Sequence, residues 1–171
     1  SVMPCLSASA EGTGLNFKGG TDSVFAGDTA EVSIDLERNP GVAGINLYYT
    51  FDTTYLTLTE VVNQNSHFNL TYNTTSVWDA SSSYTDDGTL ATLKFKVADN
   101  TPAGTYNVKI NVLSVYNDVP ARVTATSADA VITVRDVELE RIKITTEPAR
   151  KEYSVGDTLS LAGMVVTGYY N

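Results

Sequence analysis

The sequence of 171 residues contains one cysteine, Cys5, and one histidine, His67. A single cysteine excludes an internal disulfide framework and a CxxC metal site. A single histidine leaves no partner for a histidine-based metal site or a catalytic triad. No apolar run reaches the roughly 18 residues that a membrane-spanning helix needs. The scarcity of these residues therefore removes several classes of catalytic, metal-binding and membrane protein.

Cationic residues are also few, with 11 Lys and Arg against 20 Asp and Glu, so the formal net charge is −9. This balance disfavours nucleic acid as a partner, because neutralising phosphates requires clustered cations. The 42% of apolar and 18% of charged residues are ordinary for a folded protein. The length suits one well-packed domain plus a small addition.

Groups that could converge on a catalytic site are scarce. An enzyme needs a nucleophile with a base, paired carboxylates, or a metal with its ligands. The run Asp86-Asp87-Gly88 is typical of a turn. Asp52, Asp79 and the Asp86–Asp87 pair could offer oxygens to calcium, but no D-x-[DN]-x-[DN]-G loop is present. We therefore predict a protein without catalytic residues, without a metal site and without a cofactor of its own.

A strict alternation of side chains is the strongest pattern in the sequence. In the stretch GINLYYTFD, residues 44–52, apolar residues take the odd positions, and Asn46, Tyr48 and Thr50 take the even ones. Successive side chains of a strand point to opposite sides, so this stretch predicts a strand with one buried face and one outward face. What meets the outward face, whether water, a sugar or a protein, is left open by the alternation.

The same alternation recurs along the chain, between turn residues and without helical periodicity. Besides the strand at 45–51, it predicts strands at 15–19, 30–36, 55–61, 67–73, 75–81, 89–97, 106–112 and 128–134. Nine short strands without crossover helices predict an all-β fold, a nine-stranded antiparallel β-sandwich with jelly-roll topology over residues 14–136.

Both ends of the chain depart from this pattern. Ala8-Ser9-Ala10 has the small-x-small form of a secretory cleavage site, so residues 1–13 are predicted to be a leader or signal-peptide remnant. Residues 137–171 start a new strand pattern but are too few to bury a core comfortably. This segment either packs on the first domain or is the front of a second, truncated domain, and we favour the second interpretation.

The aromatic residues bear on whether the sandwich binds sugars. Tyr48 is the clearest outward ring, whereas Trp78 shares its parity with Ala80 and is predicted to lie in the core. One outward ring is a poor platform for a sugar. A carbohydrate-binding jelly roll and an Ig-like structural or adhesive spacer nevertheless stay as alternatives to a protein-binding module.

An ordered set of motifs gives the chain a family resemblance. GDTAEVSIDLERNPGVAGINLYYTFDTTYLTLTEV (27–61), followed by DGTLATLKFKVADNTPAGTYNVKI (87–110), resembles cohesin modules, the receptor units of cellulosome scaffoldins. The likeness lies in the order of Gly-Asp-Thr, G-[IV]-x-G-x-x-x-x-[YF]-x-[YF]-D, Asp-Gly-x-[LF]-A-T and Pro-x-Gly over roughly residues 20–134. The segment LERIKITTEPARKEYSVGDTLSLAGMVVTGYYN (139–171) is similar to the opening half of bacterial Ig-like modules.

The resemblance implies a non-catalytic module of an extracellular, polysaccharide-degrading bacterial assembly, secreted or attached to the cell surface. Its partner would be a dockerin, a small helical module on an enzyme or another scaffold. Calcium is expected on that dockerin and not on this chain, which would be a monomer when unbound. The resemblance also implies that one sheet, built from the third, fifth, sixth and eighth predicted strands, offers its outer face to the dockerin.

The resemblance places the partner contacts at the outward positions of these four strands. They are Asn46, Tyr48, Thr50, Asn69, Thr71, Asn73, Val77, Asp79, Asn107, Lys109 and Asn111. The best-known subgroup carries outward Asn and Asp on its third strand, where this chain has Gly44 and Asn46. Donors and acceptors at the centre of such a face decide specificity, so this difference bears on which dockerin would be bound.

Overall fold

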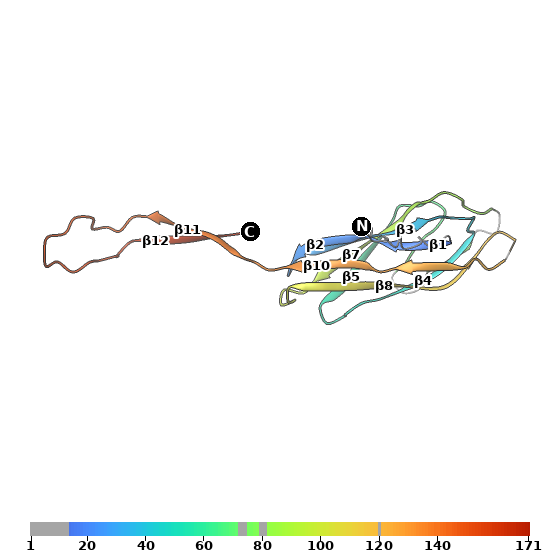
Figure 1. The fold of residues 1–171 in the computed structure, drawn as a ribbon, viewed down its shortest axis with the longest axis horizontal. Coiled ribbons are helices and arrows are strands. Elements are labelled where there is room, and N and C mark those ends of the chain that lie inside the picture. The colour runs from blue at the N-terminus through green and yellow to red at the C-terminus, as the bar shows by residue number, and fades with distance from the viewer. Residues whose placement is uncertain (1–13, 72–74, 79–81, 120) are drawn as a thin grey trace, which may run out of the picture. The chain divides into compact units, whose positions relative to one another are not determined.

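The computed structural model describes residues 14–171 except 72–74, 79–81 and 120. The chain divides into two compact units, Ser1–Arg135 and Asp136–Asn171, and each is described by itself. No described segment is a helix that could cross a membrane. The strands of the first unit are β1 (Leu15–Gly19), β2 (Thr21–Phe25), β3 (Thr29–Glu37), β4 (Gly44–Thr50), β5 (Leu56–Asn63), β6 (Thr75–Trp78), β7 (Gly88–Val97), β8 (Gly104–Tyr116), β9 (Ala125–Ala128) and β10 (Ala130–Arg135) (Figure 1).

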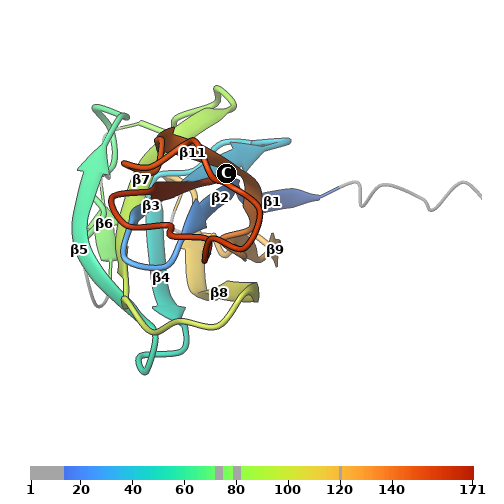
Figure 2. The same cartoon turned by 90° about the vertical axis from the view of Figure 1, so that its left-hand side faces the viewer.

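The first unit is a sandwich of two five-stranded sheets (Figure 2). Their strand orders are β5-β7-β3-β1-β9 and β2-β10-β8-β4-β6. Side chains of both sheets fill the space between them, and Phe17, Phe95 and Ile110 have no exposed surface. This arrangement confirms the predicted all-β fold, because the alternating apolar positions of each strand form one shared core.

The chain crosses from one sheet to the other at Gly19-Gly20. The strand predicted at 15–19 matches β1, whereas β2, which follows the crossing, was not predicted. β1 pairs with β3 and β9 in the first sheet, whereas β2 pairs with β10 in the second. A Cβ atom on Gly19 would lie 2.1 Å from the backbone nitrogen of Ala130, and one on Gly20 would lie 2.5 Å from Ser33 Oγ. Glycine is thus required here by the close approach of backbone to backbone.

A matching crossing occurs near the end of the sandwich, at Asp129. β9 pairs in parallel with β1, and β10 pairs in parallel with β2. The strand predicted at 128–134 corresponds to β10, whereas β9, which accompanies β1, was not predicted apart from Ala128. The described part of the first unit holds ten strands in place of the nine that were predicted.

The strand predicted at 67–73 is wrong, because the described residues 67–71 contain no strand. Asn63, the last residue of β5, holds this segment with its side chain. Its Oδ1 accepts a hydrogen bond from the backbone nitrogen of Leu70 at 2.6 Å, and its Nδ2 donates to the Leu70 carbonyl at 3.0 Å. A side-chain amide thereby replaces a strand ladder as the partner of the backbone.

The burial predicted for this segment is nevertheless right. Phe68 and Leu70 are each 2% exposed, whereas Asn69 and Thr71 are exposed. The ring of Phe68 meets that of Tyr84 edge-on, with centroids 5.8 Å apart. The alternation thus identified the core residues, although the backbone between them is irregular.

The second unit is a hairpin of β11 (Leu139–Thr146) and β12 (Val165–Tyr170). Its register places Leu139 opposite Tyr170, and Ile144 opposite Val166. Together with Ile142, these apolar side chains occupy one side of the hairpin and are between 48% and 66% exposed. A two-stranded hairpin with an open apolar side is marginally stable alone.

The amide of Asn63 provides a test of this account of residues 67–71. Asn63→Ala leaves the backbone of Leu70 without its partners, so we expect the free energy of unfolding to fall by about 1–3 kcal/mol. Chemical denaturation followed by tryptophan fluorescence measures the change. Asn100→Ala, an exposed position in the turn after β7, is the control and should change the stability by less than about 0.5 kcal/mol. Equal effects of the two substitutions would contradict the role of Asn63.

Candidate functional site

The structure brings together the predicted outward positions of β4 and β8. The register pairs Tyr48 with Asn111 and Thr50 with Lys109. Directly opposed residues of an antiparallel pair have their side chains on the same side of the sheet. We call this surface the β4/β8 face, and its members are Asn46, Tyr48, Thr50, Asn107, Lys109, Asn111 and Ser114.

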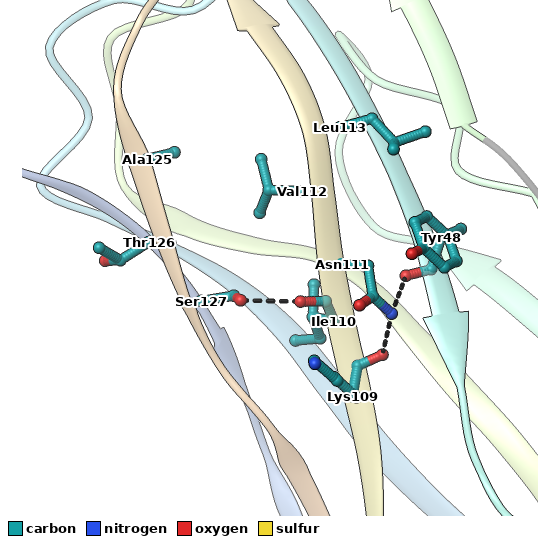
Figure 3. A pocket seen from close by; sticks show the side chains of 9 residues that line it. All are labelled: Tyr48, Lys109, Ile110, Asn111, Val112, Leu113, Ala125, Thr126 and Ser127. Carbon is teal, nitrogen blue, oxygen red and sulfur yellow. Dashed lines mark hydrogen bonds between the residues drawn. The ribbon is translucent and has the colours of Figure 1, made fainter.

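A single amide ties the two strands of the β4/β8 face together. Asn111 Nδ2 lies 3.1 Å from Thr50 Oγ1, and 3.4 Å from the carbonyl oxygens of both Tyr48 and Lys109, to which it donates. Figure 3 shows Asn111 turned toward Tyr48 on the neighbouring strand. The half-buried ring of Tyr48 and the exposed side chain of Lys109 flank this amide. Asn111 therefore orders the centre of the face.

A β-bulge in β8 determines which residue of β8 lies opposite Asn46 on the face. The register pairs Leu47 with Val112 but Asn46 with Ser114, so Leu113 is an extra residue. Simple alternation would turn residue 115 outward, yet Val115 is 1% exposed. The extra residue shifts the alternation by one position, which returns Val115 to the core. Leu113 itself is 46% exposed. The adjacent apolar pair Val112-Leu113 is the one sign of the bulge in the alternation.

Asn46 holds an acceptor that is enclosed but not satisfied. Its Oδ1 is buried and accepts no hydrogen bond within the part of the chain that the structure describes. The side chain as a whole is half-buried on the β4/β8 face. An enclosed acceptor without a donor raises the free energy of the folded domain by about 1–3 kcal/mol. Such groups often mark sites where a structure does more than hold itself together.

Two predicted contact residues do not join the β4/β8 face. Asn69 Oδ1 accepts a hydrogen bond from Asn63 Nδ2 at 2.9 Å, and Asn63 belongs to β5 of the other sheet. Thr71 follows in the same exposed segment. The resemblance had assigned both to a strand of the binding sheet. They lie elsewhere because Asn63 anchors their segment to the edge of the opposite sheet.

The register of β6 differs by one residue from the predicted alternation. Ser76 pairs with Asn46 and Trp78 with Gly44, whereas Val77 pairs with Ile45, a core residue. Ser76 and Trp78, and not Val77, thus occupy the register positions of the outward residues of β4. The predicted contacts Asn73 and Asp79 lie outside the described residues.

Charges are distributed unequally between the two outer surfaces of the sandwich. The sheet of β3 and β7 carries ion pairs: Lys94 Nζ lies 3.5 Å from Glu31 and 3.3 Å from Glu60, and Lys18 Nζ lies 3.1 Å from Glu37. The hydrogen bond to Glu60 raises the pKa of Lys94. The hydrogen bond from Lys18 lowers the pKa of Glu37. Cations and carboxylates of this outer surface are thus paired with each other at several positions.

The opposite outer surface is almost uncharged. Its outward positions on β2, β4, β8 and β10 follow from the registers of these strands, and the only charged residues among them are Lys109 and Arg135. The carboxylates of a chain with 20 acidic residues are absent from these positions. The middle of a protein–protein interface is depleted of charge in the same way and favours aromatic and amide groups.

Clusters of metal ligands and stacked aromatic rings are the features of interest among the described residues. These residues contain no group of three or more His, Cys, Asp or Glu side chains that could hold a metal ion. Two aromatic pairs of the sandwich, Phe51–Phe95 and Tyr55–Tyr106, meet at 78° and 68°. Rings that meet edge to face do not form the flat platform that a sugar ring needs.

Comparison with protein families gives one match. A family model described as "Cohesin domain" matches residues 15–134. No curated protein matches the chain. The matched range covers the sandwich from Leu15, the first residue of β1, to Val134 near the end of β10. The second unit lies outside it.

Solved structures share the fold of the sandwich. The third cohesin of ScaC from Acetivibrio cellulolyticus, solved in complex with the ScaB dockerin, is 23% identical, with a TM-score of 0.62 over 70% of this chain and 98% of that chain. The Coh-OlpA–Doc918 cohesin–dockerin complex of Clostridium thermocellum is 13% identical, with a TM-score of 0.62 over 71% and 99%. A non-cellulosomal cohesin of Archaeoglobus fulgidus is 18% identical, with a TM-score of 0.59 over 72% and 92%. These likenesses confirm the jelly-roll sandwich.

The amide of Asn111 provides a test of how the β4/β8 face is ordered. Asn111→Asp replaces the donor by a carboxylate facing two carbonyl oxygens, so we expect the free energy of unfolding to fall by about 1–3 kcal/mol near pH 7. Asn107→Asp makes the same change of charge at an exposed position of the same strand. It should shift the stability by less than about 0.5 kcal/mol in denaturation experiments. If both variants are equally stable, Asn111 does not order the face.

Proposed function

Because the chain belongs to the cohesin family over residues 15–134, we propose that it is a non-catalytic receptor module whose β4/β8 face binds a dockerin on a partner protein. The observation that carries this proposal is the contrast between the two outer surfaces. One is covered by ion pairs, and the other is an ordered, nearly uncharged sheet of amides, hydroxyls and one central ring. Ion pairs that are already satisfied add little to binding, whereas an uncharged surface is inexpensive to desolvate.

The residues of the β4/β8 face have different parts in this proposal. Tyr48 supplies the apolar contact at the centre, since buried aromatic residues carry much of the energy of an interface. Thr50, Asn107 and Lys109 lie exposed around it and form a polar rim. Asn46 is the specificity position, because a partner donor that draws its amide out of the enclosed arrangement would remove the penalty of the unsatisfied oxygen.

The proposal extends to the setting of the module. Two of the similar structures are complexes of a cohesin with a dockerin, and one of these cohesins belongs to the protein ScaC. We infer that this chain serves in an extracellular, polysaccharide-degrading assembly, with calcium held by the dockerin. A carbohydrate-binding module and a structural spacer are the competing functions, and neither explains why one outer surface lacks charge.

Capture of a dockerin tests the β4/β8 face directly. Dockerin modules encoded in the same genome are titrated with the chain in the presence of calcium, and the affinity is measured by calorimetry. Tyr48→Ala should weaken binding by about 30-fold or more, as expected for the central ring of an interface. Thr57→Ala, at an exposed position of β5 in the opposite sheet, should bind like the unsubstituted chain.

A chelator adds a second arm to the same experiment. It should abolish capture while leaving the thermal midpoint of the isolated chain unchanged, because the calcium would belong to the dockerin. Equal weakening by Tyr48→Ala and Thr57→Ala would show that the wrong surface has been chosen. Binding of soluble glycans by the chain, without capture of any dockerin, would favour the carbohydrate-binding function.

We further propose that residues 137–171 form the first part of an Ig-like domain, whose later strands cover the apolar side of the β11–β12 hairpin. The exposure of Ile142 and Ile144 supports this, since a sheet with one apolar side needs a second layer. The segment follows the sandwich as a separate compact unit, which suits a string of modules.

Hydrogen exchange tests the Ig-like interpretation. Amides of Ile142, Ile144 and Val166 are compared between this chain and one extended by the residues that the gene encodes after Asn171. We expect protection of these amides to rise by about 100-fold or more in the extended chain, because opening then requires unfolding of a whole domain. Unchanged exchange in the extended chain would contradict the proposal, and the amides of β7 in the sandwich serve as the internal control.

A further inference from the structure

A groove runs along β8, on the side that faces away from β4. β8 pairs with β10 through Val108 and with β4 from Lys109 onward, each on a different edge. On the edge facing β9, no described strand pairs with β8 between Lys109 and the bridge of Tyr116 to Arg122. β9 is itself the last strand of its sheet. Two strand edges therefore face each other without forming a ladder.

Side chains keep this gap from closing. Ser127 Oγ donates to the carbonyl oxygen of Ile110 at 2.7 Å, and Arg122 Nη2 donates to that of Leu113 at 3.1 Å. These donors satisfy backbone carbonyls that a neighbouring strand would otherwise satisfy. The result is an open groove of about 460 Å³, and Figure 3 shows the side chain of Val112 directed into it, between β8 and β9. A second hollow of about 170 Å³ continues it past Leu113 toward Arg122.

The groove has a charge opposite to that of the protein. Lys109 lies at one end and Arg122 at the other, and no Asp or Glu lines either hollow. The chain as a whole carries a formal charge of −9. Between the two cations, apolar side chains lie among polar ones: Val112 and Ala125 are half-buried and Leu113 is exposed, next to Asn111, Thr126 and Ser127. The local chemistry thus complements an anionic ligand with an apolar centre.

The geometry limits the shape of that ligand. Lys109 and Leu113, whose carbonyl Arg122 holds, are four residues apart on one strand, which is about 13 Å. An extended chain with two acidic side chains four residues apart matches this span. A helix brings such residues within about 6 Å of each other and would span half the distance.

We propose that this groove binds an extended peptide segment of a partner protein, with two acidic residues four positions apart and an apolar residue between them. The segment lies in the groove between β8 and β9 and is held through its side chains, because Ser127 and Arg122 already satisfy carbonyls of this edge. Its acidic residues meet Lys109 and Arg122, and its apolar residue rests on Val112, Leu113 and Ala125. The groove adjoins the β4/β8 face but does not depend on the function proposed for that face.

A synthetic pentapeptide tests the proposal. Acetyl-Glu-Val-Thr-Val-Glu-amide and its counterpart with both Glu replaced by Lys are titrated into the ¹⁵N-labelled chain, and amide shifts are followed by NMR. The acidic peptide should shift the amides of Ile110, Leu113, Ala125 and Ser127, with a dissociation constant of about 1 mM or tighter. The Lys peptide should produce no saturable shift at these amides, and added salt should weaken the acidic peptide.

Substitutions distinguish binding in the groove from nonspecific electrostatic attraction to the protein. Lys109→Ser should weaken the acidic peptide about fivefold, whereas Lys151→Ser, which removes the same charge from the second unit, should not change its binding. Equal binding of both peptides, shifts confined to other strands, or equal effects of the two substitutions would overturn the proposal. Shifts of the groove amides on dilution of the chain alone would place a second copy in the groove and would also overturn it. Loss of dockerin capture leaves this result untouched, because no dockerin is present.

Discussion

The structure depends on one constraint, which is that the chain passes twice between the two sheets at the same place. A Cβ atom on Gly19 would lie 2.1 Å from the nitrogen of Ala130, so the two crossings touch backbone to backbone. β1 and β9 run together in one sheet, and β2 and β10 run together in the other. β10 can therefore accompany β8 only as far as Val108. Beyond that residue β8 pairs with β4 alone, which creates the β4/β8 face on one side and the groove on the other.

The two outer surfaces of the sandwich differ in how their polar groups are satisfied. On the sheet of β3 and β7, Lys94 is already paired with two carboxylates and has little to offer a partner. On the β4/β8 face, Asn111 satisfies oxygens within the sheet while the ring of Tyr48 stays partly open. The charged groups of the first surface are hydrated, and removing this water would cost free energy on association. The second offers order without charge, which lowers both the entropic and the desolvation penalties of binding.

The sequence predicted correctly those parts of the fold that depend only on the alternation within a single strand. Alternation assigned the buried residues of β3, β4 and β7 correctly, because each of these strands has one face on the core. It failed wherever the outcome depends on a distant residue. The amide of Asn63 decides the path of residues 67–71, and Ala130 decides the crossing at Gly19. The phase of β6 likewise depends on its register with β4, which no pattern within β6 contains.

The bulge at Leu113 connects the face, the groove and the limits of prediction. Without the extra residue, Ser114 would not stand opposite Asn46, and Val115 would leave the core. On the edge of β8 that faces β9, the carbonyl of Leu113 has no partner strand among the described residues and accepts a hydrogen bond from the guanidinium of Arg122. Alternation over 106–112 identified Asn107, Lys109 and Asn111 as outward because the bulge lies beyond them. The β4/β8 face therefore depends partly on the alternation of side chains, which the sequence reveals, and partly on one β-bulge, which it does not.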